Sequence, residues 1–115
     1  MKQRATADAT ALMRAMRGSI TQIDMSQRLG VAQNTLSAVE TGAHGRTPDV
    51  MQHYVDGYAQ ALLCRLLDAG DEWRFVAWQV CAVARIEPRQ WSGPTEVVEV
   101  IVGRLSDALE VADDA

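Results

Sequence analysis

The sequence predicts a mainly α-helical fold, and three observations lead to this prediction. Apolar residues recur at intervals of three and four along most of the chain, which is the spacing that gives a helix one buried face. Threonine precedes several of these periodic segments and glycine follows them, as expected at helix ends. Hydrophobic residues make up 48% of the 115 residues, so the chain can form the core of one domain.

Four helices are predicted in the first 62 residues, joined by short turns. They cover residues 8–17, 21–29, 32–41 and 47–62. Thr21 and Thr47 each have a hydroxyl that can accept a hydrogen bond from the first turn of the helix that follows. Gly18, Gly30 and Gly42 follow the ends of the first three helices, where glycine tolerates the backbone conformation that stops a helix.

Residues 63–83 leave two interpretations open. Residues 68–71 form a turn signal between two short apolar segments, which is compatible with a small β-hairpin over about 63–80. The same residues can instead form helices, but a helix over 73–83 would be apolar almost all round and would need burial on every side. Periodicity does not decide between the two, because both apolar segments are short.

A last helix is predicted after Ser92-Gly93-Pro94, since Glu87-Pro88 breaks whatever precedes it. One stripe along this helix is apolar, and it consists of Val97, Val98, Ile101, Leu105, Ala108 and Leu109. Residues 112–115 are expected to fray at the end of the chain.

The segment 21–42 is the one that points to a function. It predicts two short helices joined by a tight turn at Gly30-Val31, and the second helix has Leu36 and Val39 on its inner face. The outward residues of this second helix are Gln33, Asn34, Ser37 and Ala38. Short uncharged side chains that donate and accept hydrogen bonds match the edges of bases in the major groove, which admits an α-helix.

Residues 21–42 resemble the helix-turn-helix of the Cro/phage-repressor (XRE) family, and the resemblance extends over about residues 8–62. The matching residues are Thr21-Gln22, Ser26, Leu29-Gly30-Val31, Gln33, Thr35-Leu36-Ser37, Val39-Glu40 and Gly42. The resemblance implies a lambda-repressor-like bundle of four or five helices, whose second motif helix enters the major groove. One departure is Ala32, where the family usually has the Ser or Thr that caps this helix.

Ten residues are expected to contact DNA, and for Gln22, Gln33, Asn34, Ser37 and Arg46 the resemblance implies this role by position. Those expected to read bases are Gln33, Asn34, Ser37 and Ala38. Those expected to contact the DNA backbone are Thr21, Gln22, Thr35 and Arg46, together with Lys2 and Arg4 from an N-terminal arm.

A second resemblance is to a bacterial branch of these regulators, some of which are antitoxins. It rests on Gly42 and Arg46-Thr47, on the segment 58–62 (Tyr-Ala-Gln-Ala-Leu) and on Arg65-Leu66. That branch has a β-hairpin after this helix and Gly-Gly where the present chain has Leu63-Cys64. The resemblance implies a hairpin and a protein partner, such as a toxin, held by residues 71–115.

Charge divides the chain into two parts. Residues 1–66 carry a net charge of +2 and residues 67–115 carry −6. We therefore expect a DNA-binding domain over 1–66, and over 67–115 an acidic segment that dimerises or binds another protein. The interface expected for a homodimer combines the apolar stripe with two tryptophans: Trp73, Trp78, Val97, Ile101, Leu105 and Leu109.

No pattern of catalytic or metal-binding residues occurs in the sequence, so neither enzyme activity nor a cofactor is expected. His44 and His53 lack convergent partners, and Cys64 and Cys81 are too few for a metal cluster or a disulfide framework. No apolar run approaches the roughly 18 residues that span a bilayer, and no secretory signal is recognised at the N-terminus. These features predict a cytoplasmic protein without a membrane partner.

The expected function is sequence-specific binding of double-stranded DNA by a transcriptional regulator, a repressor of phage or bacterial origin. A homodimer would occupy a pseudo-palindromic operator, with its recognition helices about 34 Å apart. Two alternatives stay open. One is an antitoxin that represses its own operon and holds a toxin, and the other is a protein-interaction module that no longer binds DNA.

Overall fold

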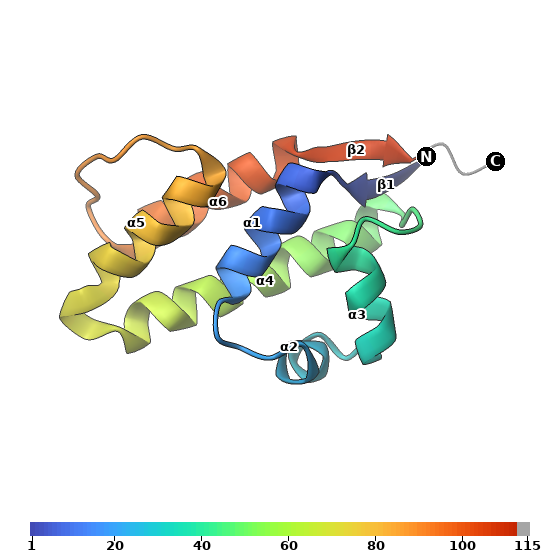
Figure 1. Ribbon diagram of the computed structural model, residues 1–115, viewed down its shortest axis with the longest axis horizontal. Helices are drawn as coiled ribbons and strands as arrows, with labels where there is room; N and C mark the ends of the chain where they lie inside the picture. Colours follow the sequence, from blue (N-terminus) through green and yellow to red (C-terminus); the bar gives the residue numbers. More distant parts are fainter. Residues whose placement is uncertain (113–115) are drawn as a thin grey trace.

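In the computed structural model, which describes residues 1–112, helices pack around one core and two short strands pair with each other (Figure 1). The elements in chain order are β1 (Lys2–Ala5), α1 (Ala7–Arg17), α2 (Gln22–Leu29), α3 (Gln33–Glu40), α4 (Pro48–Asp68), a 3₁₀ turn (Gly70–Glu72), α5 (Trp73–Ala84), α6 (Pro94–Asp107) and β2 (Leu109–Ala112). The prediction of a mainly α-helical fold is confirmed.

Threonine hydroxyls fix the start of three helices. Thr6, Thr21 and Thr47 lie in extended backbone, and each hydroxyl accepts a hydrogen bond from the backbone N–H three residues on, at 3.1 to 3.3 Å. These bonds satisfy donors that have no partner inside a helix. The predicted starts at Thr21 and Thr47 are therefore confirmed.

The predicted β-hairpin over about 63–80 is wrong, because these residues are helical. α4 continues to Asp68, and α5 begins at Trp73 after a single 3₁₀ turn. The mainly apolar sequence of α5 is accommodated by packing against α1, α4 and α6, which covers one side of the helix. The opposite side stays exposed and carries Phe75 and Trp78, so burial on every side is not required.

The sheet joins the two ends of the described chain. β1 and β2 are antiparallel, with Lys2 opposite Ala112 and Ala5 opposite Leu109. The residues predicted as an N-terminal arm therefore lie in a strand, and Arg4 Nε donates to Glu110 Oε1 at 2.8 Å. Of the tail expected to fray, residue 112 belongs to β2 and residues 113–115 lie outside the described part of the chain.

The apolar stripe of α6 is part of the core, and its assignment to a dimer interface is wrong. Val97, Ile101 and Leu105 are completely buried, because α6 packs on α4 and α5 of the same chain. Side chains without accessible surface in one folded chain cannot contact a second folded chain. Trp73 and Leu109 are partly buried against the same core, and only Trp78 of the predicted interface is largely exposed.

The core is continuous across the expected division of the chain. The boundary predicted after residue 66 falls inside α4, and a single cluster of buried residues includes side chains from α1 to α6. The molecule is elongated, at 47 × 27 × 19 Å, with α3 and α5 toward opposite ends (Figure 1). No helix within residues 1–112 is long and apolar enough to cross a membrane.

Candidate nucleic-acid interface

α2 and α3 form the helix-turn-helix that the sequence predicts, and local bonds fix the turn. Gly30 adopts the left-handed conformation at φ 71°, which favours glycine because it has no Cβ. The backbone N–H of Val31 donates to the carbonyl of Ser26 at 3.0 Å, and Ser26 is buried. Its hydroxyl donates to the carbonyl of Ile23 at 2.7 Å, so this polar group is satisfied inside the structure.

α3 presents its polar face to solvent at one end of the molecule (Figure 1). Leu36 and Val39 are buried on its inner side. Among the residues predicted to read bases, Gln33 and Asn34 are exposed, whereas Ser37 and Ala38 are partly exposed, as is Thr35. The predicted face of α3 is therefore accessible, with no large or charged side chain among these five residues.

The start of α3 differs from the starts of its neighbours. Ala32 occupies the cap position in extended backbone, but it offers no side-chain hydrogen bond to the first turn. Thr21 makes this bond for α2. Because Ala32 is exposed, the first backbone N–H groups of α3 can meet water or another acceptor.

A buried carboxylate holds the other end of α3 in place. Glu40 is completely buried, and its Oε2 and Oε1 accept from Nε and Nη2 of Arg17 at 2.8 and 2.9 Å. Oε1 also accepts from the Gln22 amide nitrogen at 3.0 Å, and Oε2 accepts from the Tyr58 hydroxyl. We call these four side chains the Glu40 network. It connects α1, α2, α3 and α4 through one carboxylate.

Electrostatics in the Glu40 network favour the ionised carboxylate. Burial raises the pKa of Glu40, but the hydrogen bonds from Arg17, Tyr58 and Gln22 outweigh burial and hold that pKa below its usual range. The hydrogen bond to Glu40 raises the pKa of Arg17. Burial and the neighbouring carboxylate raise the pKa of the Tyr58 hydroxyl, which therefore stays protonated and able to donate.

Two residues predicted to contact the DNA backbone have structural roles in the fold. The amide nitrogen of Gln22 is bonded to Glu40, so Gln22 helps to orient α2 against α3. The hydroxyl of Thr21 caps α2. We did not predict the Glu40 network from the sequence. The helical period does place Glu40 on the same inner side of α3 as Leu36 and Val39, and a charged residue at such a position could have been recognised as one that needs buried partners.

The predicted basic residues Lys2, Arg4 and Arg46 lie on two neighbouring backbone segments, one of which is in the loop that follows α3. Gln3 in β1 exchanges two backbone hydrogen bonds with Arg46, at 2.6 and 2.7 Å. This bridge brings Arg46 next to the strand that carries Lys2 and Arg4. Successive side chains of a strand point to opposite faces, so the Arg46 side chain shares the face of Gln3. Lys2 and Arg4 lie on the other face of β1, where Arg4 is paired with Glu110.

Thr41 and His44 extend the exposed surface of α3, and neither was assigned to it from the sequence. Thr41 lies three residues after Ala38 and seven after Asn34, so the helical period places it on the same face. His44 is exposed in the following loop at φ 59°. The backbone at Gly42 packs directly against β1, because a Cβ on this residue would lie only 2.5 Å from the carbonyl oxygen of Ala5.

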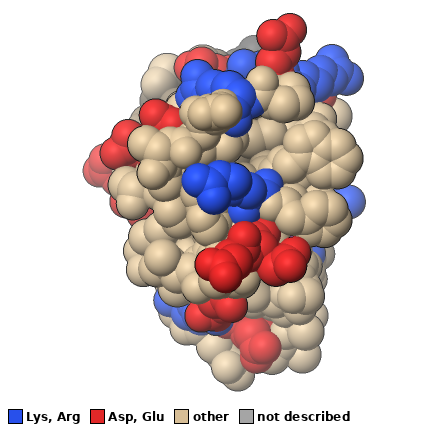
Figure 2. All heavy atoms as spheres, turned by 90° about the vertical axis from the view of Figure 1, so that its left-hand side faces the viewer, with Lys and Arg blue, Asp and Glu red and all other residues tan. Residues whose placement is uncertain are grey.

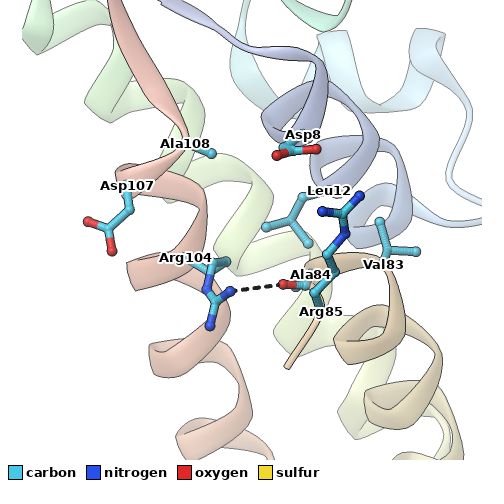
Figure 3. A pocket seen from close by; sticks show the side chains of 8 residues that line it. All are labelled: Asp8, Leu12, Val83, Ala84, Arg85, Arg104, Asp107 and Ala108. Atoms are coloured by element: carbon cyan, nitrogen blue, oxygen red, sulfur yellow. Dashed lines mark hydrogen bonds between the residues drawn. The ribbon is translucent and has the colours of Figure 1, made fainter. Parts of the chain in front are cut away.

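A pocket lies between α1, α5 and α6, away from α3 (Figures 1 and 3). Its lining is Asp8, Leu12, Val83, Ala84, Arg85, Arg104, Asp107 and Ala108. Arg104 donates to the carbonyl of Ala84 at 3.2 Å, which ties α6 to the end of α5. Within residues 1–112 no group of three His, Cys, Asp or Glu side chains could hold a metal ion.

Comparisons of this chain with protein-family models, with curated proteins and with solved structures found no match. The residues and their geometry alone therefore support the function proposed below.

Proposed function

We propose that this protein is a sequence-specific DNA-binding regulator that reads the major groove with α3. The observation that carries the proposal is the exposed face of α3, which consists of short, uncharged hydrogen-bonding side chains on the second helix of a helix-turn-helix. In this proposal Gln33, Asn34 and Ser37 bond to base edges, and Ala38 makes an apolar contact.

Contacts to the DNA backbone would set the position of α3 in the groove. In this proposal Arg46 supplies positive charge from the loop after α3, and Lys2 and Arg4 would supply it from the other face of β1, with Arg4 exchanging its partner Glu110 for a phosphate. Thr21 and Thr35 supply hydroxyls near the two motif helices. Phosphate contacts fix position and add affinity without reading sequence. The excess of positive charge over residues 1–66 is only +2, which favours a reader of particular sites over a protein that coats DNA.

A regulator of this size would act as a dimer by occupying its site. One such helix reads only a few base pairs, and two-fold pairing doubles the length that is read. Bound across a promoter, the dimer would exclude other proteins from it. The antitoxin alternative gains no support from the fold, because the hairpin that the second resemblance implied is replaced by α4 and α5.

Selection from random duplex DNA tests the proposal. Several rounds with the full chain are expected to enrich a common sequence, and the matched variant Asn34→Ala is expected to enrich a different or weaker one. Leu67→Ala is the control for losses unrelated to α3, because it changes an exposed side chain near the end of α4 that has no assigned role in binding. A full chain that enriches no sequence contradicts the proposal.

A further inference from the structure

The pocket between α1, α5 and α6 is a concave site to which the proposed function assigns no role. Its volume is about 270 Å³, slightly below the range of about 300–1,000 Å³ that holds drug-sized ligands. Leu12 and Ala84 in its lining are buried, and Val83 and Ala108 add apolar surface. The pocket therefore suits a small molecule with a short apolar body.

Two basic and two acidic side chains line the same pocket. Arg85 and Arg104 come from the end of α5 and from α6, and Asp8 and Asp107 come from α1 and α6. All four are exposed, so a ligand can reach them from solvent. None of them forms an ion pair within residues 1–112. Figure 3 shows Arg85 extending over the pocket toward Asp8 without a bond between them.

The arginine at the end of α5 is not needed to stop the helix. Arg85 has φ 57°, the left-handed conformation that favours glycine. Its backbone N–H donates to the carbonyl of Ala82 at 3.2 Å, and the N–H of Ile86 donates to the carbonyl of Cys81 at 2.9 Å. Glycine would make these bonds without the strain, so the fold gives no reason for a long cationic side chain here. Such strain is typical of binding sites.

Arg104 is held in the pocket wall and keeps donors available. Its Nη1 donates to the carbonyl of Ala84 at 3.2 Å, and it makes no other hydrogen bond within residues 1–112. A guanidinium has several N–H donors in a planar fork, which matches the two oxygens of a carboxylate. The remaining donors of Arg104 can therefore bind an anionic group in the pocket.

We propose that this pocket binds a small zwitterion of the class of a free amino acid with an aliphatic side chain. Arg85 and Arg104 bind its carboxylate, and Asp8 binds its ammonium group. The aliphatic side chain lies against Leu12 and Ala84, which removes apolar surface from water. Because the four charged side chains of the pocket sum to zero, a ligand that carries both charges fits better than a simple anion or cation.

Calorimetric titration of the full chain with three probes of one shape tests the proposal, and it uses no DNA. L-leucine carries both charged groups, isocaproate lacks the ammonium group and isoamylamine lacks the carboxylate. L-leucine is expected to bind at one site per chain. Each of the other two should bind at least about tenfold more weakly, because it loses one set of charged contacts. Absence of L-leucine binding, or equal binding of either analogue, overturns the proposal.

Two substitutions test the location of the site. Arg85→Gly removes a partner of the carboxylate, and it should fold at least as well as the unaltered chain, because glycine favours this backbone conformation. Asp8→Asn removes the partner of the ammonium group. Each variant should bind L-leucine about tenfold more weakly, and thermal unfolding checks that both are folded. Unchanged binding by either folded variant overturns the proposal.

The matched controls Arg74→Gln and Asp71→Asn remove one charge of each sign outside the pocket. Both residues belong to the end of the molecule where α4 leads into α5, and Figure 2 shows acidic and basic groups beside uncharged surface there. Both controls should bind L-leucine as the unaltered chain does. Losses as large as those of Arg85→Gly would show that the general charge of the surface, and not the pocket, attracts the ligand.

Discussion

Glu40 bonds α3 to three other helices through one buried side chain. Its carboxylate accepts bonds from side chains on α1, α2 and α4, and all of these contacts are made inside the protein. A buried carboxylate is costly unless it is fully bonded. The Glu40 network therefore fixes α3 in one position relative to the other three helices.

Replacing Glu40 should destabilise the protein strongly. Glu40→Gln keeps the shape but removes the charge opposite Arg17, and breaking a buried pair in this way costs about 3–5 kcal/mol. Glu110→Gln is the control, because it removes an ion pair whose two side chains are about half exposed, and such pairs contribute about 1 kcal/mol or less. Urea unfolding of both variants measures the difference. Equal losses would show that Glu40 contributes no more than a surface charge.

Acidification should weaken the contribution of Glu40. Because the pKa of Glu40 is lowered in the folded protein, its stabilisation is complete above the unfolded value of about 4.3 and is lost as the pH falls through the folded value. The difference in unfolding free energy between the unaltered chain and Glu40→Gln should therefore shrink below pH about 4. Urea unfolding at several pH values measures it, and a difference independent of pH would mean that Glu40 is not ionised.

Gln33 and Arg46 should affect DNA binding in different ways. Gln33→Ala is expected to remove about 1–3 kcal/mol of preference at one or two base pairs of each half-site. Arg46→Ala is expected to weaken binding to all sequences alike and to lower the salt slope by about one. Titrations of single-base site variants at several salt concentrations separate the two effects. If the two variants change sequence preference to the same degree, their assigned roles are wrong.

At the scale of elements, helix ends could be predicted from the sequence because single residues determine them. Thr21, Gly30 and Thr47 act through local hydrogen bonds or local backbone conformation. The helical state of residues 63–83 could not be predicted, since it depends on packing against distant elements. The sheet was missed for the same reason, because β1 and β2 lie at opposite ends of the described sequence.

The exposed face of α3 could be predicted from the sequence, because the helical period separates its outward residues from its buried ones. The same period places Thr41 on that face. The buried stripe of α6 shows the limit of that reasoning. Periodicity indicates that Val97, Ile101 and Leu105 share a face, but it does not say whether that face meets the same chain or another one. The exposure of Phe75 and Trp78 on α5 likewise became visible only in the folded chain.

The missing cap of α3 can be supplied by one substitution. Ala32 already has the extended conformation of a cap residue, so Ala32→Ser should raise the free energy of unfolding by about 0.5–2 kcal/mol. Thr21→Ala, which removes the cap of α2, should lower it by a similar amount. Urea denaturation measures both changes. An Ala32→Ser variant no more stable than the unaltered chain would show that this helix start needs no side-chain acceptor.

At the scale of the whole molecule, α6 should be indispensable for folding. Ile101→Asp places a charge without a partner in the shared core, which costs about 4 kcal/mol or more. The variant should therefore lose the structure of residues 1–66 as well, as measured by circular dichroism and limited proteolysis. Trp78→Glu on the exposed side of α5 should stay folded. A folded helix-turn-helix in Ile101→Asp would mean that residues 1–66 form an independent domain.

At the scale of the whole molecule, α3 and α5 lie toward opposite ends, and the location of bound DNA is the most direct test of the proposed function. A duplex obtained by selection, added to isotope-labelled protein, should shift the amide resonances of residues 33–38, Thr41 and 43–46. The resonances of α5 should not move, because this helix lies toward the other end of the molecule's long axis. Shifts centred on α5, or no shifts in α3, would contradict the account.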